Sequence, residues 1–345
     1  MQLSKLSKGL KAAYGGSNVV NRVRHFDGWI DRAFADDTGA NRYDHTDTVT
    51  EYYDLCTEFM VFSWSESLHF TPLAPGESLE DSQIRHQRLM ITKLELQEGM
   101  TAVDVGCGVG GPMRRVMQET GVRVVGVNSN VSQIEKAKSL NAEAGLERLA
   151  DYVACSFMDM SGIEDGTFDR GYAIESTCHA PDKAGAFAEI YRVLKPGALF
   201  WGQEMCLTDK FDPDDVGHQA IKRDLMHGVA LKEIATTDEV DRALEAAGFQ
   251  VEEGTDLAVA EGDPAVPWYR PVERRYGTLG AALSRIPLGR QAYIGATRLA
   301  EALGVFPKGS ADVVGFMDLT AAAFVAGGRT GIFTPLYCFL ARKPS

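Results

Sequence analysis

An apolar stretch that runs into two ionisable side chains is the part of this sequence best suited to chemistry. Residues 170–174 are typical of a strand, Glu175 follows directly, and His179 comes four positions later. A carboxylate and an imidazole at this spacing can act as a proton acceptor and the group that orients it. A structural role competes with this interpretation, because strand-end caps and surface histidines use the same residue types. Glu204, at the end of a later strand-like run, is a third candidate, and Glu58 and Glu66 remain open.

A glycine-rich loop is the second feature that could hold a small molecule. Residues 103–111, Val-Asp-Val-Gly-Cys-Gly-Val-Gly-Gly, predict a strand that ends in this loop. Asp104 inside the strand would repel a pyrophosphate, and Asn128 stands where a dinucleotide site carries an acid. Glycines allow close approach of the backbone, and Asp104 can attract an ammonium group. The pattern favours S-adenosylmethionine as the cofactor, the alternative being a tight turn without a ligand.

The elements that must position these residues alternate along the middle of the chain. Strands are predicted at 102–105, 122–127, 152–156, 170–174 and 199–205, with helices at 112–119, 131–144, 182–194 and 237–247. This alternation predicts an α/β fold with a parallel, doubly wound sheet. Pro112 suits a first helical turn, Thr236 and Glu239 suit a capping box, and Gly248 suits a helix end. The carboxyl ends of such strands meet at one edge, so the two features should face the same crevice.

The two ends of the chain differ from the middle. Residues 1–85 look irregular and polar, yet six aromatic residues fall between Tyr52 and Phe70. Residues 260–332 show short helical patterns interrupted by prolines, and 336–341 is again a strand that could return to the main sheet. We expect an N-terminal cap and substrate segment (1–85), a cofactor-binding core (86–259), a C-terminal substrate cap over the strand ends (260–332) and a last strand in the core sheet (333–345). Trp268 and Tyr269 should face the ligand cavity or its entrance.

Composition narrows the partners and the compartment. The chain has 345 residues, 45% of them hydrophobic, and a net charge of −13, which argues against a nucleic-acid-binding face. None of the six cysteines forms a C-x-x-C pair, so we expect reduced thiols and no metal site. No segment reaches the ~18 uninterrupted apolar residues of a membrane span. The sequence favours a cytoplasmic protein. It is compatible with peripheral membrane contact, because Lys5, Lys8 and Lys11 alternate with leucines near the start, and with a homo-oligomer.

Several motifs together make the chain resemble one family. Asp104 to Pro112 is similar to the cofactor loop of the sterol 24-C-methyltransferases, and Tyr172 to Pro181 is similar to their signature decapeptide. The similarity runs from about Tyr52 to Lys343 and includes residues 189–197, 208–210, 267–269, 288–291, 325–328 and 333–335. The family's run Tyr-Glu-Tyr-Gly-Trp-Gly is replaced by Met60-Val61-Phe62-Ser63-Trp64-Ser65, and Ser156 replaces an aspartate near the adenine.

The resemblance implies a seven-stranded Rossmann-like methyltransferase sheet with an α-rich cap inserted before the last strand. It implies methyl transfer from S-adenosylmethionine to the C24 double bond of a sterol, through a carbocation that loses a proton to a base. The catalytic candidates are then Glu175, His179 and Glu204, and the cofactor candidates are Asp104, Gly106, Cys107, Gly108, Asn128, Ser156 and Phe157. The substrate candidates are Tyr52, Phe59, Phe62, Trp64, His69, Phe70, Trp268 and Tyr269. Two alternatives stay open: a C-methyltransferase of another isoprenoid alkene, such as a linear triterpene or prenyl compound, and a non-catalytic lipid or cofactor binder.

Overall fold

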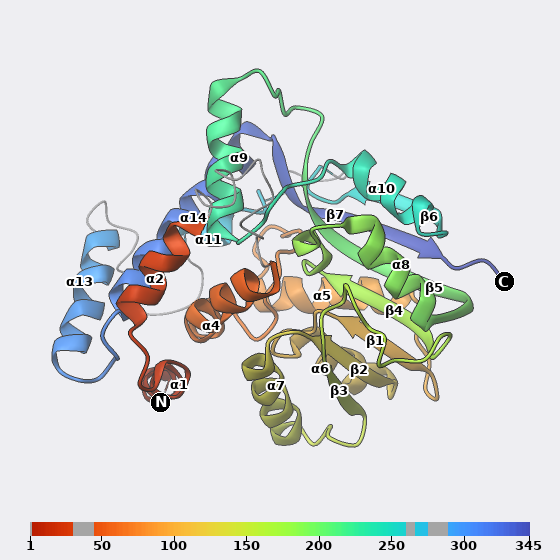
Figure 1. Cartoon of the computed structure of the whole chain (residues 1–345), viewed down its shortest axis with the longest axis horizontal. Helices are drawn as coiled ribbons and strands as arrows, with labels where there is room; N and C mark the ends of the chain where they lie inside the picture. Colours follow the sequence, from red (N-terminus) through yellow and green to blue (C-terminus); the bar gives the residue numbers. More distant parts are fainter. Residues whose placement is uncertain (1, 30–44, 260–265, 275–288) are drawn as a thin grey trace. The chain divides into compact units, whose positions relative to one another are not determined.

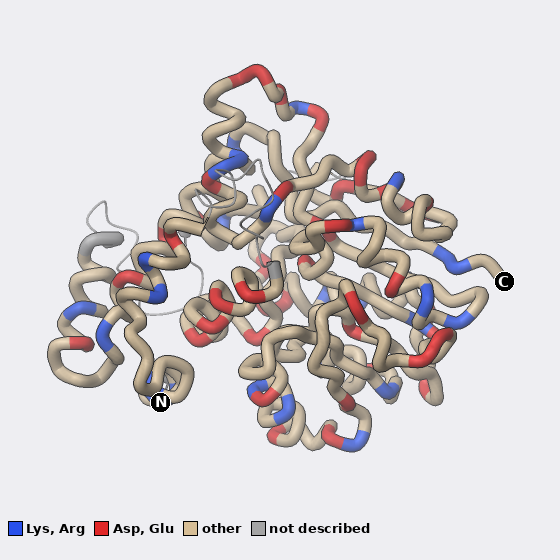
Figure 2. Tube along the Cα trace, viewed as in Figure 1, with Lys and Arg blue, Asp and Glu red and all other residues tan. Residues whose placement is uncertain are grey.

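The computed structural model describes residues 2–29, 45–259, 266–274 and 289–345 (Figure 1). They form two compact units built from interleaved segments. Unit 1 comprises Met1–Ser65, Asp212–Glu233 and Tyr269–Thr330, and unit 2 comprises Glu66–Phe211, Ile234–Trp268 and Gly331–Ser345. Acidic and basic residues are scattered along both units (Figure 2). The predicted divisions at residues 85, 259 and 332, and the placement of a cap over the strand ends, stay predictions.

Unit 2 contains a seven-stranded sheet in the order β3-β2-β1-β4-β5-β7-β6. Its strands are β1 (Thr101–Val105), β2 (Arg123–Asn128), β3 (Ala150–Ala154), β4 (Phe168–Ile174), β5 (Leu194–Leu207), β6 (Gln250–Asp256) and β7 (Phe333–Arg342). The first five strands pair in parallel, whereas β7 runs antiparallel between β5 and β6. The α/β fold with a last strand that returns to the sheet is therefore confirmed. The prediction of parallel strands is confirmed for β1 to β5, the strands for which it was made.

Helices cover both faces of this sheet. They are α5 (Leu79–Lys93), α6 (Gly111–Thr120), α7 (Val131–Glu143), α8 (Lys183–Val193) and α10 (Thr237–Ala246), with a short 3-10 turn η1 (Thr177–His179). Alternate residues of β1 point to opposite faces, so Ala102 packs with Met90 of α5 and Met113 of α6, while Val103 packs with Phe187 of α8. The two resulting hydrophobic clusters hold the sheet edge rigid, which is what a strand-end site requires.

The predicted helix boundaries have visible physical causes. Thr236 and Glu239 form a reciprocal capping box at the start of α10, and Pro112 lies in the first turn of α6. Gly121 and Gly248 follow helix ends with φ of +70° and +100°, a conformation that costs glycine little. β3 begins and ends two residues earlier than the sequence predicts, and β5 begins at Leu194 rather than Leu199.

Unit 1 is helical. Its elements are α1 (Gln2–Tyr14), α2 (Val19–Asp27), α4 (His45–Ser63), α9 (Val216–Gly228), α11 (Arg270–Arg274), α13 (Gly289–Ala302) and α14 (Ser310–Thr330). The sequence-based description of the first 85 residues as irregular is wrong, because α1, α2, α4 and α5 occupy most of their described part. The leucines of α1 supply its buried stripe, with Leu6 and Leu10 inside the unit.

Among the described residues, α14 is the one helix long and apolar enough to span a membrane by length and composition. It packs against α9, α13 and α11 of the same unit, and Phe316, Thr320 and Phe324 are buried. Thr320 donates a hydrogen bond of 3.0 Å to the carbonyl oxygen of Gly228 in α9. These contacts are those of a core helix of unit 1.

Candidate active site at the carboxyl edge of the sheet

The glycine loop after β1 lies where parallel strands present their carboxyl ends. The backbone N–H groups of Gly106 and Cys107 both donate to the carbonyl oxygen of Val127 on β2, at 2.7 and 3.1 Å. Gly106 has φ of +79°, and a Cβ there would stand 2.3 Å from Cβ of Ser176. Gly106 is therefore needed both for its conformation and for the close approach of the segment that follows β4.

Asp104 is a buried acid with an unpaired oxygen beside this loop. Its side chain is 3% exposed, and within the described residues Oδ2 makes no hydrogen bond. Burial raises the pKa of Asp104 to about 7, and the nearby Tyr172 hydroxyl opposes this in part, although the two groups do not reach hydrogen-bond geometry. An unpaired buried carboxylate is costly unless a donor or cation joins it.

The loop leaves room for such a ligand. Apart from Gly108 itself and its two chain neighbours, no heavy atom of the described residues lies within 4 Å of the position that a Cβ would take at Gly108, whose φ is +52°. Asn128, at the end of β2, donates to the carbonyl oxygen of Asn130 and to Oε1 of Gln133, so an amide and not an acid stands there. Asp104, Gly108 and Asn128 thus offer a negative charge, an open backbone and an amide at one edge. These three groups suit the ammonium and ribose groups of S-adenosylmethionine. Cys107 packs against Gly126 and contributes bulk.

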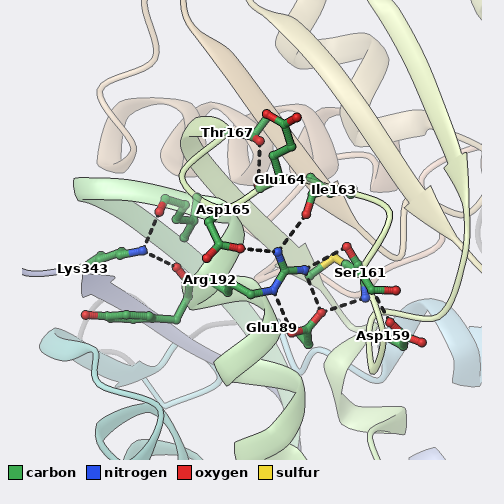
Figure 3. A network of polar contacts seen from close by, with 12 residues as sticks. Asp159, Ser161, Ile163, Glu164, Asp165, Thr167, Glu189, Arg192 and Lys343 are labelled. Carbon is green, nitrogen blue, oxygen red and sulfur yellow. Dashed lines mark hydrogen bonds and ion pairs between the residues drawn. The ribbon is translucent and has the colours of Figure 1, made fainter.

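Ser156 and Phe157 begin the loop after β3 at the same edge. The Ser156 hydroxyl accepts a hydrogen bond from the N–H of Met158. Further along, Arg192 of α8 ties this loop down, because its guanidinium donates to the carbonyl oxygens of Met160 and Ile163, both at 2.8 Å (Figure 3). Glu189 completes the network by accepting from Arg192 and from the N–H of Met160. Glu189 and Arg192 of the run 189–197 therefore have a structural role in holding the loop that follows β3.

Glu175 has an unusual backbone and a well-defined side chain. Its φ is +49°, which is uncommon for a residue with a Cβ and points to functional constraint. Oε1 accepts from the N–H of Phe70 at 2.6 Å and from Nε2 of Gln203 at 2.7 Å. Oε2 makes no hydrogen bond within the described residues. Burial raises the pKa of Glu175 well above its usual value, and the neighbouring charge of Glu204 adds to this, while the two donors oppose it.

Gln203 and His86 are functional candidates that the sequence did not reveal. Nε2 of Gln203 lies 3.1 Å from the carbonyl oxygen of Phe70 and 3.0 Å from that of Pro335, so it must be the amide nitrogen. Oε1 of Gln203 therefore faces Nε2 of His86, 2.6 Å away, which must carry the proton. Burial lowers the pKa of His86 to about 3, so the ring is neutral. No motif marks these residues, because they come from a helix and a strand far apart in the sequence.

Glu204 has different partners from Glu175. It is fully buried, and its oxygens contact the Thr177 hydroxyl and Nζ of Lys183, the latter at 3.1 Å. Burial lowers the pKa of Lys183, but the charge of Glu204, its hydrogen bond and the nearby Cys178 and Cys206 together outweigh burial, so the net shift is upward. Glu204 is thus an ion-paired carboxylate with both oxygens engaged.

The histidines do not pair with Glu175. His179 lies in the turn η1 and is buried, yet no hydrogen bond or ion pair joins it to Glu175 in the described structure. His69 is buried as well, its Nδ1 is 2.8 Å from the carbonyl oxygen of Phe70, and burial lowers its pKa to about 4. Gln87 of α5 contacts Nε2 of His69 at 2.9 Å. His69 therefore holds the segment that brings the Phe70 N–H to Glu175.

Two ion-paired residues fix that segment against the glycine loop. Arg114 of α6 donates to Glu66 at 2.6 Å and to the carbonyl oxygen of Val109 at 2.9 Å. A Cβ at Gly111 would stand 2.3 Å from the backbone oxygen of Glu66, so only glycine allows this contact. Glu66, which the sequence left open as a base, is a partner of Arg114 in the structure.

The predicted aromatic residues divide between the two units. In unit 2, the ring of Phe70 lies edge-on to that of Trp268, with centroids 5.1 Å apart, and Trp268 lies 5.9 Å from Phe333. In unit 1, Tyr52 packs with Phe26 and Phe316, and Phe59 with Phe306. Phe62, Trp64 and Tyr269 are half-buried residues of unit 1. The structure therefore brings the backbone of Phe70 to Glu175 and packs Trp268 against the Phe70 ring, while the substrate role of all these residues stays a prediction.

Comparison with known proteins decides the family. A methyltransferase domain model matches residues 103–202, and a sterol methyltransferase C-terminal model matches residues 282–345. The chain is 42% identical to a cycloartenol-C-24-methyltransferase of Arabidopsis thaliana over 300 residues, which are 87% of this chain and 88% of that protein. It is 37% identical to a sterol 24-C-methyltransferase of Saccharomyces cerevisiae, covering 94% and 85% of the two chains. The chain belongs to the sterol C-24-methyltransferase family.

Solved structures agree with the fold of this sterol C-24-methyltransferase family member. A cyclopropane synthase of Mycobacterium tuberculosis superposes with a TM-score of 0.66 at 19% identity, covering 88% of this chain and all of that one. A geranyl diphosphate C-methyltransferase of Streptomyces coelicolor superposes with a TM-score of 0.61 at 18% identity. The predicted family and fold class are confirmed. Within the described residues, no group of His, Cys, Asp and Glu could hold a metal, and all six cysteines are free.

Proposed function

We propose that this protein transfers the methyl group of S-adenosylmethionine to the C24 side-chain double bond of a sterol. The observation that carries the proposal is the similarity to cycloartenol and sterol C-24-methyltransferases over most of the chain, together with a strand edge that presents Asp104 and Glu175. The enzyme class and the cofactor follow from the family. The alternatives of another isoprenoid alkene or a non-catalytic lipid binder have no comparable support.

The glycine loop and its neighbours bind the methyl donor. Asp104 attracts the cationic methionyl end of the cofactor. The backbone of Gly106, Cys107 and Gly108 lies along this methionyl part, and Asn128 binds the ribose. Ser156 and Phe157 flank the adenine. When bound, S-adenosylmethionine supplies an electrophilic methyl group on a positively charged sulfur. A buried carboxylate with pKa near 7 becomes ionised beside such a cation, which explains why Asp104 is left unpaired.

Glu175 is the base in this proposal. The π electrons of the alkene form the new C–C bond, a tertiary carbocation remains on the substrate, and a hydride shift precedes loss of a proton. That proton goes to Oε2 of Glu175, because Oε1 is already engaged by Phe70 and Gln203. The two donors favour the ionised carboxylate against the effect of burial. His179 and Glu204 remain secondary candidates, and both oxygens of Glu204 are already engaged by Thr177 and Lys183.

Aromatic rings stabilise the cation and exclude water. Phe70, whose N–H binds Glu175, packs edge-on against Trp268, and these two rings are the proposed cation-stabilising pair. The substrate role of Tyr52, Phe59, Phe62, Trp64, His69 and Tyr269 is proposed from the sequence resemblance alone. A cytoplasmic location, contact with a membrane surface and a homo-oligomer belong to the proposal as well.

The test begins with purified protein, labelled S-adenosylmethionine and a panel of sterols and acyclic terpenes. We expect label in sterols with a side-chain double bond and none in saturated sterols, because only the alkene can attack the methyl group. Transfer to acyclic terpenes alone would favour the other isoprenoid class. No transfer to any alkene, with intact cofactor binding, would favour the non-catalytic binder.

A binding measurement tests the cofactor site separately. Asp104→Ala should weaken S-adenosylmethionine binding by at least about tenfold in calorimetry, since a charge-assisted contact contributes roughly 1.5–3 kcal/mol. Asp151→Ala removes an exposed carboxylate of β3 that pairs with Arg123 of β2; it is the matched control and should bind normally. Unchanged affinity in Asp104→Ala, or tight binding of NAD, would contradict the assignment.

A further inference from the structure

Asp104 and Tyr172 lie side by side on neighbouring strands of the sheet. They are partners in the parallel register of β1 and β4, while Gly126 of β2 adjoins Asp104 on its other side (Figure 1). Tyr172 packs in the same cluster as Met90 of α5 and Ala102, which points to the same face of β1 as Asp104. Asp104 is 3% exposed and Tyr172 is fully buried. A hydrogen-bond acceptor and a donor therefore lie together away from water.

Each of these two residues has a buried atom without a hydrogen-bond partner. Within the described residues, the atoms are Oδ2 of Asp104 and the hydroxyl oxygen of Tyr172. Tyr337 of β7 and Asp241 of α10 are the same two residue types in the other hydrophobic cluster, and there the tyrosine hydroxyl donates to Oδ1 at 2.6 Å. Buried polar groups are normally paired, so the open pair beside the glycine loop needs an explanation.

The other ionisable groups near Asp104 are neutral or already have partners. Burial raises the pKa of Cys107 well above its usual value and the pKa of Tyr152 on β3 to about 12, so both side chains are uncharged. Arg114 of α6 has its own carboxylate partner at 2.6 Å. Burial also raises the pKa of Tyr172 well above its usual value, and the charge of Asp104 adds to this, so the hydroxyl keeps its proton. Tyr172 is therefore the neighbour that can donate to Asp104 when this acid is charged.

We infer that Tyr172 is a positioning residue for the cofactor, which donates to Oδ2 of Asp104 and so holds this acid in the charged form that binds the methionyl cation. A charged carboxylate accepts a hydrogen bond more strongly than a neutral one, so the bond and the charge form together. The proton that Asp104 loses goes to solvent, and Tyr172 keeps its own. Because Tyr172 is fully buried, it acts through Asp104 and not by touching the cofactor. The inference rests on the proposed role of Asp104 in cofactor binding.

The pH dependence of S-adenosylmethionine binding, measured by calorimetry without any methyl acceptor, tests this inference. The cofactor binds the ionised form of Asp104, so affinity should fall as the pH drops below about 7, by at most about tenfold per pH unit. Tyr172→Phe removes a donor that lowers the pKa of Asp104, so this acid limb should move to higher pH. A move of about half a pH unit is about a threefold loss of affinity at pH 6, and at least this much is expected. Measurements stay below about pH 7.5, because an α-amino group such as that of the cofactor loses its proton near pH 8.

Two further variants serve as controls. Tyr337→Phe removes the same hydroxyl from the closed pair with Asp241, so it should lower stability toward urea and leave the acid limb in place. Asp104→Asn cannot ionise, so its weaker binding should show little of this pH dependence, and adding Tyr172→Phe should change it no further. Tyr172→Phe alone should unfold at no lower urea concentration than the unaltered protein, because its hydroxyl has no hydrogen-bond partner to lose.

An acid limb that stays in place in Tyr172→Phe, or that moves equally in Tyr337→Phe, would overturn the inference and assign Tyr172 to packing. A further loss of affinity when Tyr172→Phe is added to Asp104→Asn would also overturn it, because Tyr172 would then act without Asp104. Failure of the proposed cofactor site gives a different result, namely unchanged affinity in Asp104→Ala, and that result would reject both proposals. Weakened binding in Asp104→Ala with an unmoved acid limb in Tyr172→Phe would reject the inference alone.

Discussion

Two carboxylates stand at the carboxyl ends of neighbouring strands and differ in almost every other respect. Glu175 follows β4, has left-handed backbone geometry, and is held through one oxygen by the neutral donors Phe70 N–H and Gln203. Glu204 lies within β5, and its oxygens contact Thr177 and Lys183. Both side chains are buried. Of these two side chains, only Glu175 has an oxygen that makes no hydrogen bond within the described residues.

The difference shows how burial can serve two purposes at one sheet edge. The contacts with Thr177 and Lys183 engage both oxygens of Glu204 and hold it against the turn after β4. Neutral donors hold Glu175 in place while burial raises its pKa, so its affinity for a proton is increased. The comparison predicts that substitutions near Glu204 change folding, whereas substitutions near Glu175 change the reaction.

Lys183→Met should give the largest effect. The substitution leaves the Glu204 carboxylate buried without its cation, and loss of one partner of a buried pair costs roughly 3–5 kcal/mol. We expect a corresponding fall in the free energy of unfolding measured with urea, largely restored when Glu204→Gln is added. Arg123→Met, which breaks an exposed pair with Asp151, should cost less than about 1 kcal/mol. Similar losses in both variants would refute the distinction between the pairs.

The sequence alone predicts the glycine loop, Asp104 and Glu175 at the carboxyl edge of the sheet, but it does not predict the residues that hold them in place. Glycine spacing, the Asp104 position and the apolar run before Glu175 follow from short-range rules for parallel strands. Gln203, His86 and Lys183 could not be selected in this way, because their partners come from distant segments and depend on the register of β4 against β5. The helices of α1, α2 and α4 were missed, because aromatic and polar residues in that region obscure a helical period that tertiary packing stabilises.

Gln203→Leu should have the next largest effect and should act on the reaction. It removes a donor that lowers the pKa of Glu175, so that pKa rises further and the base becomes ionised only at higher pH. The acid limb of the kcat profile should move to higher pH, with a stability loss of about 1–3 kcal/mol from unpaired groups. Gln87→Leu also removes buried amide contacts, to Ser67 and His69, but should leave the profile in place. A shift of equal size in the two variants would assign Gln203 a merely structural role.

A smaller effect concerns the pH dependence of folding. Burial lowers the pKa of His86 to about 3, whereas an unfolded histidine titrates near 6.5. Between these values only the unfolded state binds the proton, so stability falls as the pH is lowered, by up to about 1.4 kcal/mol per pH unit. His86→Gln can still donate to Gln203 and should show a flatter dependence between pH 6 and pH 4 in urea unfolding. An unchanged slope would mean that His86 is not neutral in the folded protein.

The central claim is that Glu175 accepts the proton, and Glu175→Gln tests it most directly. The amide keeps the size of the side chain and can still accept the Phe70 N–H, so calorimetry should show normal S-adenosylmethionine binding. Methyl transfer to the sterol should fall by at least about a hundredfold, as expected for loss of a general base. Glu204→Gln, measured in parallel, should lose much less. Near-normal methylation by Glu175→Gln, with the same product alkene, would contradict the account and would assign the proton to another base, Glu204 first.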